Sequence, residues 1–556
     1  MNENILYHLV ELCALKGIRH AVLCPGSRSA PFTIAFARNK KIKCLTISDE
    51  RSAAFIALGI AQENDFPVVL VCTSGSAAYN FSPAVAEAFF QQIPLIVITA
   101  DRPKEWIDQL DGQTIRQKEL YGAHVKKYYE LPQDYLHTDS EWHANRILNE
   151  AINFSQSGLK GPVQINAPFH EPLYPSDASK ITTKEVRIID SLIPSPTLSQ
   201  KDWKLIEEQL LNKKVLIVSG QNSSDKELCE TLTKFHDSYH LPIVGDILSN
   251  LHPLPFFCGH TDTFLAALSE DEKKQIQPDV LITFGKSLIS KNLKLFLRKF
   301  QPKQHWHIQE SGDVADTFQC LTRIIPLSPI SFFNSLTKMN VSKVDPDFEK
   351  KWLNAEDRIR IKIKNFFEQK HDGEFQLVKK ILESLPSCNL HLANSMTIRY
   401  ANHIGLTNIK TDVNVFSNRG TSGIDGCSST AVGHAIAKDI PNVLITGDLA
   451  FFYDRNAFWH NYALPNLFVI VLNNEGGIIF NLIDGPSSLP EKDEFFITQQ
   501  KLNAKSLASE FGFSYDGPTV DMKDFFKSNG KVRILEIISS QSINKEIFED
   551  FKKQLK

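Results

Sequence analysis

The sequence predicts an α/β protein of three parallel-sheet domains, in which the first and third domains are related. Three observations support this prediction. The chain has 556 residues, which is too many for one hydrophobic core. Short apolar runs alternate with helical segments along it, as they do in βαβ units with buried parallel strands. One pattern of strand, helix, proline and strand also occurs twice, once near each end of the chain.

The first predicted domain covers residues 1–180. It opens with an amphipathic helix over 4–16, which Gly17 ends as a C-cap. Apolar runs then predict strands at 20–24, 43–48, 66–72, 95–99 and 161–166, with small-residue helices over 52–62 and from the TSGS turn through Phe90. Residues 109–121 are polar and predict a loop that leads into a helix.

The second predicted domain covers residues 195–335 and is another parallel α/β unit. Its strands are expected at 214–219, 242–245, 279–284 and 306–309, with a helix near 225–239. The glycines near its strand ends form no GxGxxG motif, so we predict no dinucleotide site there. Segments 176–200 and 326–347 are interpreted as linkers, the first because it is rich in Ser, Thr and Pro.

The third predicted domain covers residues 345–556. After a charged helix near 347–370, apolar runs predict strands at 390–393, 413–417, 443–446, 467–472 and 532–538. A glycine-rich loop, SNRGTSGIDG, begins at the end of the second of these strands. From the end of the third strand onward, the order Gly447, Asn456, Pro465 parallels Gly75, Asn80, Pro94 of the first domain. This matching order and spacing predicts that the two domains are related.

Composition narrows the classes of function. The formal net charge is −3, which gives no reason to expect nucleic acid as a partner. Nine cysteines are scattered without a CxxC pair, which favours reduced thiols in a cytoplasmic protein over a disulfide framework or a cysteine zinc site. The N-terminus lacks the basic region of a signal peptide, and no run of 18 apolar residues exists, so we expect no membrane span.

Oxygen ligands for a metal are predicted where two neighbouring strands end. Asp448 follows one apolar run and Asn474 follows the next, and a right-handed crossover brings both to the same sheet edge. A carboxylate and an amide oxygen suit Mg²⁺ that is already bound to a phosphate. Gly476 and Gly477 let the backbone approach such a ligand. For the GD or the NN dipeptide taken alone, the alternative is a plain turn at a strand end.

Arginine is scarce in this chain, with 16 residues against 45 lysines, yet several arginines lie in or beside predicted strand-end loops. They are Arg28, Arg102, Arg116, Arg399 and Arg419. Planar bidentate binding of carboxylates needs the guanidinium group, so the cluster predicts a substrate with several carboxylates. Ordinary ion pairs are the alternative for any one of them.

Glu50 is the candidate acid–base group. It lies at a predicted strand end, immediately before an apolar helix. A carboxylate in such a place can share a proton with a ligand nitrogen. The alternative is that Glu50 is simply the neighbour of a helix N-cap.

A series of motifs runs in order over nearly the whole chain: CPGSRSAPF, DERSAAFIALGIA, TSGSAA, TADRP, GQTIRQ, NSMTIR, SNRGTSGIDG and GDLAFFYD with NNEGGIIF. The last pair is similar to the thiamine diphosphate motif, with Leu449 where many members have Gly and with Glu475 beside the site. Together the motifs resemble the 2-succinyl-5-enolpyruvyl-6-hydroxy-3-cyclohexene-1-carboxylate synthases of menaquinone biosynthesis. The resemblance implies a thiamine-diphosphate-binding fold and a transferase that uses thiamine diphosphate with Mg²⁺ or Mn²⁺. Such an enzyme decarboxylates 2-oxoglutarate and adds the resulting carbanion to isochorismate.

The resemblance also implies roles for residues at matching positions. Glu50 is the catalytic residue, because it would hydrogen-bond the aminopyrimidine N1′ of the cofactor, while Ile424 would prop the cofactor in a bent conformation. The cofactor positions are Glu50, Ser74, Gly75, Ile424, Asp448, Asn474, Gly476, Ile479 and Phe480, of which Asp448, Asn474 and Gly476 hold the metal. The substrate positions are Ser27, Arg28, Arg102, Gln113, Lys291, Ser395, Arg399 and Arg419. A homodimer or homotetramer with active sites at the subunit interface is expected.

Two alternatives remain at this point. Another thiamine diphosphate enzyme, such as an acetolactate synthase or a 2-oxo acid decarboxylase, shares the cofactor motif. The SNRGTSGIDG and GQTIRQ loops and the arginines argue against it, because a substrate with few carboxylates does not need them. A non-catalytic binding or scaffold protein with this fold is the second alternative. Its discriminator is the joint presence of Glu50, Asp448 and Asn474, which a scaffold has no reason to retain.

Overall fold

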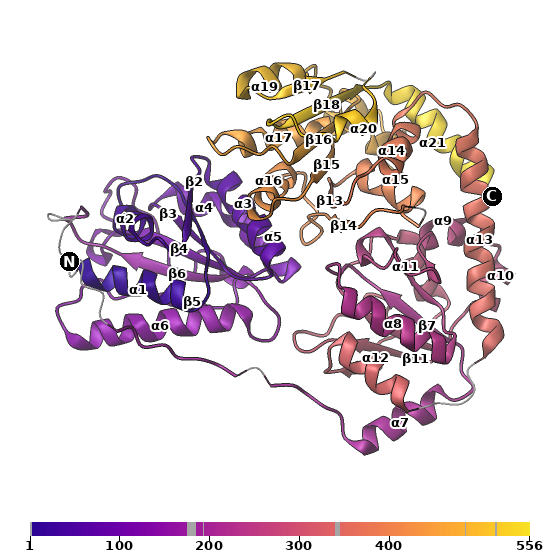
Figure 1. The fold of residues 1–556 in the computed structure, drawn as a ribbon, viewed down its shortest axis with the longest axis horizontal. Helices are drawn as coiled ribbons and strands as arrows, with labels where there is room; N and C mark the ends of the chain where they lie inside the picture. Colours follow the sequence, from indigo (N-terminus) through magenta and orange to yellow (C-terminus); the bar gives the residue numbers. More distant parts are fainter. Residues whose placement is uncertain are drawn as a thin grey trace.

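The computed structural model describes residues 3–174, 185–192, 194–339, 345–407, 409–483, 485–517 and 520–556. These residues form three six-stranded sheets, in which every pair of neighbouring strands is parallel. Each sheet is flanked by its own helices, and the three units follow one another along the chain (Figure 1). Parallel sheets of this kind are buried on both faces, which explains why the strand sequences are continuously apolar. The predicted fold class is confirmed.

The first sheet has the strand order β2-β1-β3-β4-β6-β5. Its strands are β1 (His20–Leu23), β2 (Lys43–Thr46), β3 (Val68–Cys72), β4 (Leu95–Asp101), β5 (Tyr128–Glu130) and β6 (Val163–Pro168). Its helices are α1 (Glu3–Leu15), α2 (Ala30–Arg38), α3 (Glu50–Asn64), α4 (Ser76–Asn80), α5 (Ser82–Gln91) and α6 (Thr138–Gln156). Strand β5 and helix α6 are additions to the predicted elements. Strand β5 is only three residues long. Helix α6 is mostly polar and buries a narrow face that includes Ile147 and Leu148.

The single helix predicted through Phe90 is two helices in the structure. Helix α4 ends at Asn80 and α5 begins at Ser82, with Pro83 in its first turn. A proline lacks the backbone N–H that would continue the preceding helix, and it is well tolerated in the first turn of a new one. The missing donor at Pro83 therefore interrupts the helical hydrogen-bond pattern between the two helices.

The third sheet repeats the topology of the first, with the order β14-β13-β15-β16-β18-β17. Its strands are β13 (Cys388–Leu392), β14 (Val413–Phe416), β15 (Asn442–Gly447), β16 (Leu467–Asn473), β17 (Ser514–Asp516) and β18 (Arg533–Ile538). Its helices are α14 (Glu374–Glu383), α15 (Met396–Ile404), α16 (Cys427–Ala437), α17 (Asp448–Tyr453), α18 (Ile479–Leu482), α19 (Ala504–Phe511), α20 (Met522–Phe525) and α21 (Gln541–Leu555). Since each strand takes the place of its counterpart in the first sheet, the predicted relation between the two units extends to their topology.

The second sheet has a different order, β12-β11-β10-β7-β8-β9. Its strands are β7 (Val215–Ser219), β8 (Ile243–Gly245), β9 (Phe257–Cys258), β10 (Val280–Phe284), β11 (Gln304–Ile308) and β12 (Arg323–Ile325). Its helices are α7 (Gln200–Leu210), α8 (Lys226–Tyr239), α9 (Thr261–Ala267), α10 (Glu270–Gln275), α11 (Lys291–Lys299) and α12 (Pro329–Lys338). The strand order reverses between β10 and β7, as in doubly wound sheets.

The linker prediction for 326–347 is wrong over α12. This helix packs on α8, with Phe332 and Phe333 buried and the Phe333 ring 4.9 Å from that of Phe235. Ser328 caps the helix by accepting a hydrogen bond from the Ser331 amide, and Pro329 is its first residue. Serine and proline are common both in linkers and at the start of a helix. The sequence alone therefore could not distinguish the two. Residues 340–344 lie outside the described part of the chain.

A long helix, α13 (Pro346–Glu368), connects the second and third units. It runs along the edge of the molecule from α10 towards α21 (Figure 1). Near its start, Trp352 packs against Phe264 and Phe296 of the second unit. Near its end, Phe366 packs against Phe551 of the third. These side chains belong to one continuous hydrophobic core, so the second and third units are held together by apolar burial.

The first and third units meet through α3 and α16, the two small-residue helices. A Cβ on Gly59 would lie 2.2 Å from the Thr430 carbonyl oxygen, and one on Gly433 would lie 2.3 Å from the Ile56 carbonyl oxygen. Only glycine allows the two backbones to approach this closely. Gly59 and Gly433 therefore set how closely the two related units approach each other.

No helix in the described ranges is long and apolar enough to cross a membrane. All nine cysteines fall in those ranges and none is in a disulfide. Six of them are buried, where a thiol packs as a small apolar side chain.

Candidate active site

The predicted metal-binding residues lie at the carboxyl ends of β15 and β16. These strands are neighbours, and Gly447 is in register with Leu472. Asp448 and Asn474 therefore leave the same edge of the sheet, although they are distant in sequence. Both side chains are buried, with 2% and 6% of the residue surface exposed.

Asp448 faces the loop that follows β16. Its carboxylate accepts a hydrogen bond from the Gly476 amide, and Gln500 Nε2 donates to its Oδ2 at 2.7 Å. Gln500 also donates to Asn473 Oδ1 at 3.2 Å, so it links the two strand ends. Burial raises the pKa of Asp448 above its usual range, and the hydrogen bonds act in the opposite direction. A bound cation would favour the charged form in the same way as these donors.

Asn474 leaves one oxygen without a partner. Its Nδ2 donates to Glu374 Oε1 at 2.8 Å, and its backbone oxygen accepts from Gln541 Nε2. Its Oδ1 is buried and has no hydrogen-bond partner among the described residues. A buried polar atom without a partner is costly unless a ligand or ion satisfies it. The atom is a hard oxygen donor at the sheet edge that also carries the Asp448 carboxylate, so the residues fit a divalent cation.

Gly476 completes this group through its backbone. Its φ of +152° is unusual for other residues, and a Cβ would lie 2.9 Å from the Ile497 carbonyl oxygen. A side chain at this position would therefore displace the loop that carries the third predicted ligand.

Glu374 was not singled out in the sequence, yet it sets the orientation of Asn474. It is the first residue of α14 and is fully buried, and its carboxylate also accepts from Ser539 Oγ at 2.7 Å. Burial raises its pKa to about 7, and the nearby charge of Asp448 acts in the same direction. Its contact with Asn474 spans 100 residues, and no motif marks it, so only the folded chain brings the pair together.

Glu50 is the first residue of α3, and Asp49 caps that helix by accepting from the Ser52 amide. Asn80 Nδ2 donates to Glu50 Oε2 at 3.1 Å. Glu50 is therefore the neighbour of a helix N-cap, as the alternative interpretation holds. In the described part of the chain its carboxylate forms no salt bridge. Asn80 and its counterpart Asn456 in the repeat both serve this turn, since Asn456 donates to Asp49.

Ser74 and Gly75 lie where β3 passes into α4. Ser74 Oγ is buried and has no partner among the described residues, and the Gly75 amide donates to Gln117 Oε1 at 3.0 Å. The Gln113 backbone lies directly over Gly75. Gln117, which also donates to Asn166 Oδ1, therefore anchors the GQTIRQ loop against the first sheet.

Arg28 and Arg102 form a cationic pair beside this loop. Arg28 is 5% exposed, donates to the Phe169 carbonyl, and lies 3.5 Å from Glu171. Arg102 donates to the Gly112 carbonyl and lies 3.4 Å from Asp111. Ser27, in the same turn as Arg28, is exposed. Arg116, in contrast, is exposed and pairs with Asp108.

A second cationic pair, Arg399 and Arg419, lies in the third unit. Arg399 donates to the Ser395 carbonyl at 2.5 Å, and Arg419 donates to Asn394 Oδ1 at 3.0 Å. Burial, followed by the charge of Arg419, lowers the pKa of Arg399, which marks two guanidinium groups held close together. Ser395 has a φ of +78°, an outlier for a non-glycine residue, and such strain collects at functional sites.

Lys291 is exposed at the start of α11. One helical turn further on, Lys294 is the lysine on which the charge of Arg419 acts: burial, followed by that charge, lowers its pKa. The family resemblance implies Lys291 and does not include Lys294. The position of Lys294 relative to Arg419 depends on how the second and third units pack.

Apolar residues predicted to wall the pocket lie on the loops around the metal-binding group. Ile479 and Phe480 begin α18, and the Phe480 ring is 5.6 Å from that of Phe496. Ile424 is in the glycine-rich loop before α16 and is 37% exposed.

The candidate residues thus form two groups. One comprises Ser27, Arg28, Glu50, Ser74, Gly75, Arg102 and Gln113 on the first sheet, and the other comprises Lys291, Ser395, Arg399, Arg419, Ile424, Asp448, Asn474, Gly476, Ile479 and Phe480. Within the described ranges, no hydrogen bond or ion pair joins a member of one group to a member of the other. Each group holds unpaired polar atoms and two arginines at sheet edges.

Comparison with known proteins shows the class of protein to which this chain belongs. A family model described as the N-terminal TPP binding domain of thiamine pyrophosphate enzymes matches residues 4–120, and a model of the middle domain matches residues 188–391. With its three parallel sheets and these two family matches, the chain is a thiamine diphosphate enzyme.

Similarity to individual proteins identifies the family more narrowly than the domain matches do. The chain is 43% identical to 2-succinyl-5-enolpyruvyl-6-hydroxy-3-cyclohexene-1-carboxylate synthase of Cytophaga hutchinsonii, over 99% of this chain and 98% of that protein. Synthases of the same name from Flavobacterium johnsoniae and Bacteroides fragilis are 37% and 36% identical, over 98% and 100% of this chain and 98% and 99% of theirs. The chain belongs to this family of synthases.

Proposed function

We propose that this protein decarboxylates 2-oxoglutarate and adds the resulting carbanion to isochorismate. The products are 2-succinyl-5-enolpyruvyl-6-hydroxy-3-cyclohexene-1-carboxylate and CO₂, in menaquinone biosynthesis. The observation that carries the proposal is the full-length match to a synthase of that name at 43% identity. Retention of Glu50, Asp448 and Asn474 in one chain argues further for an active enzyme.

The cofactor proposal is thiamine diphosphate with Mg²⁺ or Mn²⁺. Asp448, the free Oδ1 of Asn474 and the Gly476 carbonyl would hold the cation, which would in turn hold the diphosphate. When bound, thiamine diphosphate supplies the nucleophilic carbon and the electron sink that decarboxylation requires.

The protein residues position and protect this chemistry. Glu50 would hydrogen-bond the aminopyrimidine ring and exchange a proton with its N1′ nitrogen. Ile424 would support the bent shape of the cofactor. Ile479 and Phe480 would keep water out, which strengthens charge interactions inside the site.

The two arginine pairs suit the substrates, because both 2-oxoglutarate and isochorismate carry carboxylates. Arg28 and Arg102, with Ser27 and Gln113, would bind from the first unit. Arg399 and Arg419, with Ser395 and Lys291, would bind from the third and second units. We add Lys294 to this set because of its closeness to Arg419.

The complete site would form between subunits of a homodimer or homotetramer. Two observations support this: among the described residues no hydrogen bond or ion pair joins the two groups, and large apolar side chains are exposed in the first and third units. Tyr79 and Trp106 are each at least half exposed in the first unit, and Phe495 is 69% exposed in the third. Exposed apolar side chains of this size mark contact surfaces when they occur together.

The first test is an assay with purified protein, Mg²⁺, thiamine diphosphate and 2-oxoglutarate, with and without isochorismate. We expect consumption of 2-oxoglutarate to depend on isochorismate and kcat to fall about 100-fold or more in Glu50→Gln, since the proton relay is lost. Glu208→Gln, on the exposed face of α7, is the control for removal of a glutamate charge.

Two results would contradict the proposal. Fast release of CO₂ without isochorismate would indicate a 2-oxo acid decarboxylase instead. Full activity of Glu50→Gln would remove that residue from its assigned role.

A further inference from the structure

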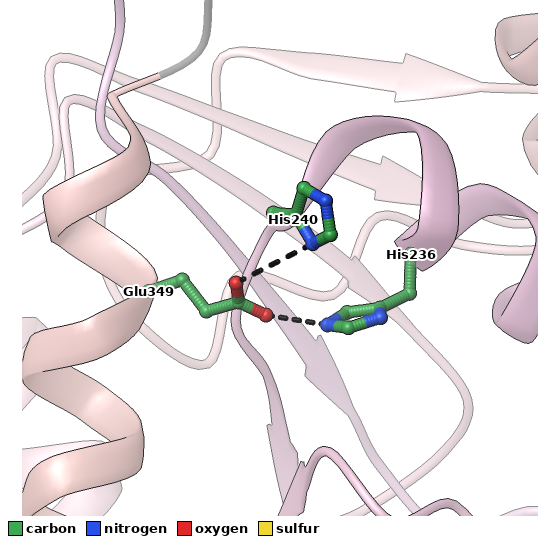
Figure 2. Close-up of side chains that lie close together, drawn as sticks. All are labelled: His236, His240 and Glu349. Atoms are coloured by element: carbon green, nitrogen blue, oxygen red, sulfur yellow. Dashed lines mark hydrogen bonds and ion pairs between the residues drawn. The ribbon is translucent and has the colours of Figure 1, made fainter.

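Two histidines and one glutamate meet at the surface between α8 and α13. Figure 2 shows both imidazole rings pointing at the carboxylate of Glu349. His236 Nε2 lies 2.5 Å from Glu349 Oε1, and His240 Nδ1 lies 4.0 Å from Glu349 Oε2. The three candidate ligand atoms all lie within 4.8 Å of one another. None of these residues belongs to the candidate active site.

The surroundings hold two of the three side chains in place. Glu349 is 9% exposed, and the His236 ring stacks on Phe256 with ring centres 3.6 Å apart and an angle of 2° between the planes. His236 lies in the last turn of α8 and His240 is the C-cap residue of that helix, in a left-handed conformation, so the end of one helix supplies both imidazoles. His240 is 64% exposed, which leaves the outer side of the group open to water.

His236 and Glu349 form a close pair, whereas His240 Nδ1 lies 4.0 Å from the other carboxylate oxygen, which is too far for a hydrogen bond. The two imidazole nitrogens and the carboxylate nevertheless converge within 4.8 Å of one another, so an ion placed between them would contact all three residues. Two imidazole nitrogens and one carboxylate oxygen are typical ligands of Zn²⁺, whereas Mg²⁺ prefers oxygen ligands alone.

We propose that His236, His240 and Glu349 form a Zn²⁺ site, with water as the fourth ligand. In a tetrahedral site the ligand atoms lie roughly 3.3 Å apart, given Zn–N and Zn–O bonds of about 2.0–2.1 Å. The His236–Glu349 contact must therefore open slightly and the His240–Glu349 contact must close, which the exposed His240 ring can do by rotation.

The site would have a structural role. Helix α8 belongs to the second sheet, while α13 leads from that sheet to the third. An ion shared by the two helices would fasten the start of α13 to the second unit. The substrate pocket would be unaffected, so zinc at this site would raise thermal stability without being needed for turnover.

The test uses the full-length protein with thiamine diphosphate and excess Mg²⁺, so that the active-site cation position is filled. Zn²⁺ is titrated by calorimetry, and Co²⁺ is added separately as a spectroscopic probe. We expect one Zn²⁺ per chain, a rise in Tm with Zn²⁺, and the intense visible absorption of four-coordinate Co²⁺.

His240→Ala is the main variant, because His240 is exposed and its loss should leave the fold intact. Loss of a supporting residue around a metal typically weakens affinity 10–100-fold, so loss of a ligand should cost about 100-fold or more. Glu349→Gln should have the same effect. His137→Ala is the matched control: His137 is also an exposed histidine beside a carboxylate, 3.4 Å from Asp139, and the described residues place no second histidine at that carboxylate.

The outcomes separate clearly. Tight binding by the wild type and by His137→Ala, with loss in His240→Ala, would support the site. Equal Zn²⁺ binding by the wild type and His240→Ala would overturn it. So would a wild-type protein that, at about 10 μM, binds no Zn²⁺ when the ion is in 100-fold excess, because a structural zinc site is saturated at that level.

Discussion

At the scale of single residues, the candidate metal site depends on Glu374, a side chain that no motif marks. Asn474 has two possible amide orientations, and its assignment follows from the hydrogen bonds around it. Glu374, an acceptor that also binds Ser539 Oγ, holds the Nδ2 side of the amide. The Oδ1 atom is then left buried without a partner among the described residues. A buried carboxylate thus determines which atom of Asn474 is available to a cation.

Removal of this acceptor should weaken the metal site without removing a ligand. We expect Glu374→Met to lower the apparent Mg²⁺ affinity by about 10–100-fold, because Asn474 loses the partner that orients it. Glu374→Gln, which keeps an acceptor oxygen, should retain more of the affinity. Mg²⁺-dependent thiamine diphosphate binding, measured by calorimetry, gives the result independently of turnover. Wild-type affinity in a folded Glu374→Met protein would show that Asn474 needs no such support.

At the scale of elements, the small-residue helices have a specific purpose. A helix rich in Gly and Ala has little amphipathic character, which predicts that it is buried. The sequence does not indicate against which element it packs. In the structure α3 and α16 are each other's partner, and the two glycines stand where the backbones are closest. The repeated pattern therefore produces a contact between the two copies.

A methyl group in this contact should destabilise the protein. Alanine in place of glycine favours a helix by about 1 kcal/mol, but overpacking typically costs roughly 1–3 kcal/mol. A Cβ on Gly433 would meet backbone atoms of α3 that cannot rotate away, so the overpacking cost should win. We expect a lower Tm for Gly433→Ala.

Gly112→Ala is the control for this measurement, because a Cβ there would have no atom within 4 Å. A Gly433→Ala protein as stable as the wild type would mean that the two helices separate easily.

At the scale of the whole molecule, the two groups of candidate residues raise the question of which chains share a site. Glu50 is hydrogen-bonded within the first unit, and Asp448 within the third. If each active site takes Glu50 from one subunit and Asp448 from another, two different inactive variants can complement each other. If each chain contains a complete site, they cannot.

Co-expression of Glu50→Gln and Asp448→Asn chains with different affinity tags tests this. A purified heterodimer would hold one intact site out of two, so we expect about half of the wild-type activity, whereas each homodimer should be inactive. A heterodimer as inactive as its parents would place both residues of a site in one chain.

Much of this protein could be predicted from local sequence. The parallel α/β class followed from the apolar runs, since strands buried on both faces leave a continuous apolar signal. Candidate residues such as Asp448 and Asn474 were identified because strand ends in parallel sheets converge on one edge. Helix α12 was missed because Ser328 and Pro329 serve equally well in a linker and at a helix start.

Sequence by itself determined the class of fold, the internal repeat, and the chemical types of the candidate site, because these depend on periodicity and on the ends of strands. Tertiary structure alone decided which residues, distant in the sequence, come together around the candidate sites. The pairing of Glu374 with Asn474, the approach of Lys294 to Arg419 and the meeting of His236, His240 and Glu349 join residues from different elements. Such contacts depend on how helices and sheets pack, and packing leaves no periodic signal in the chain.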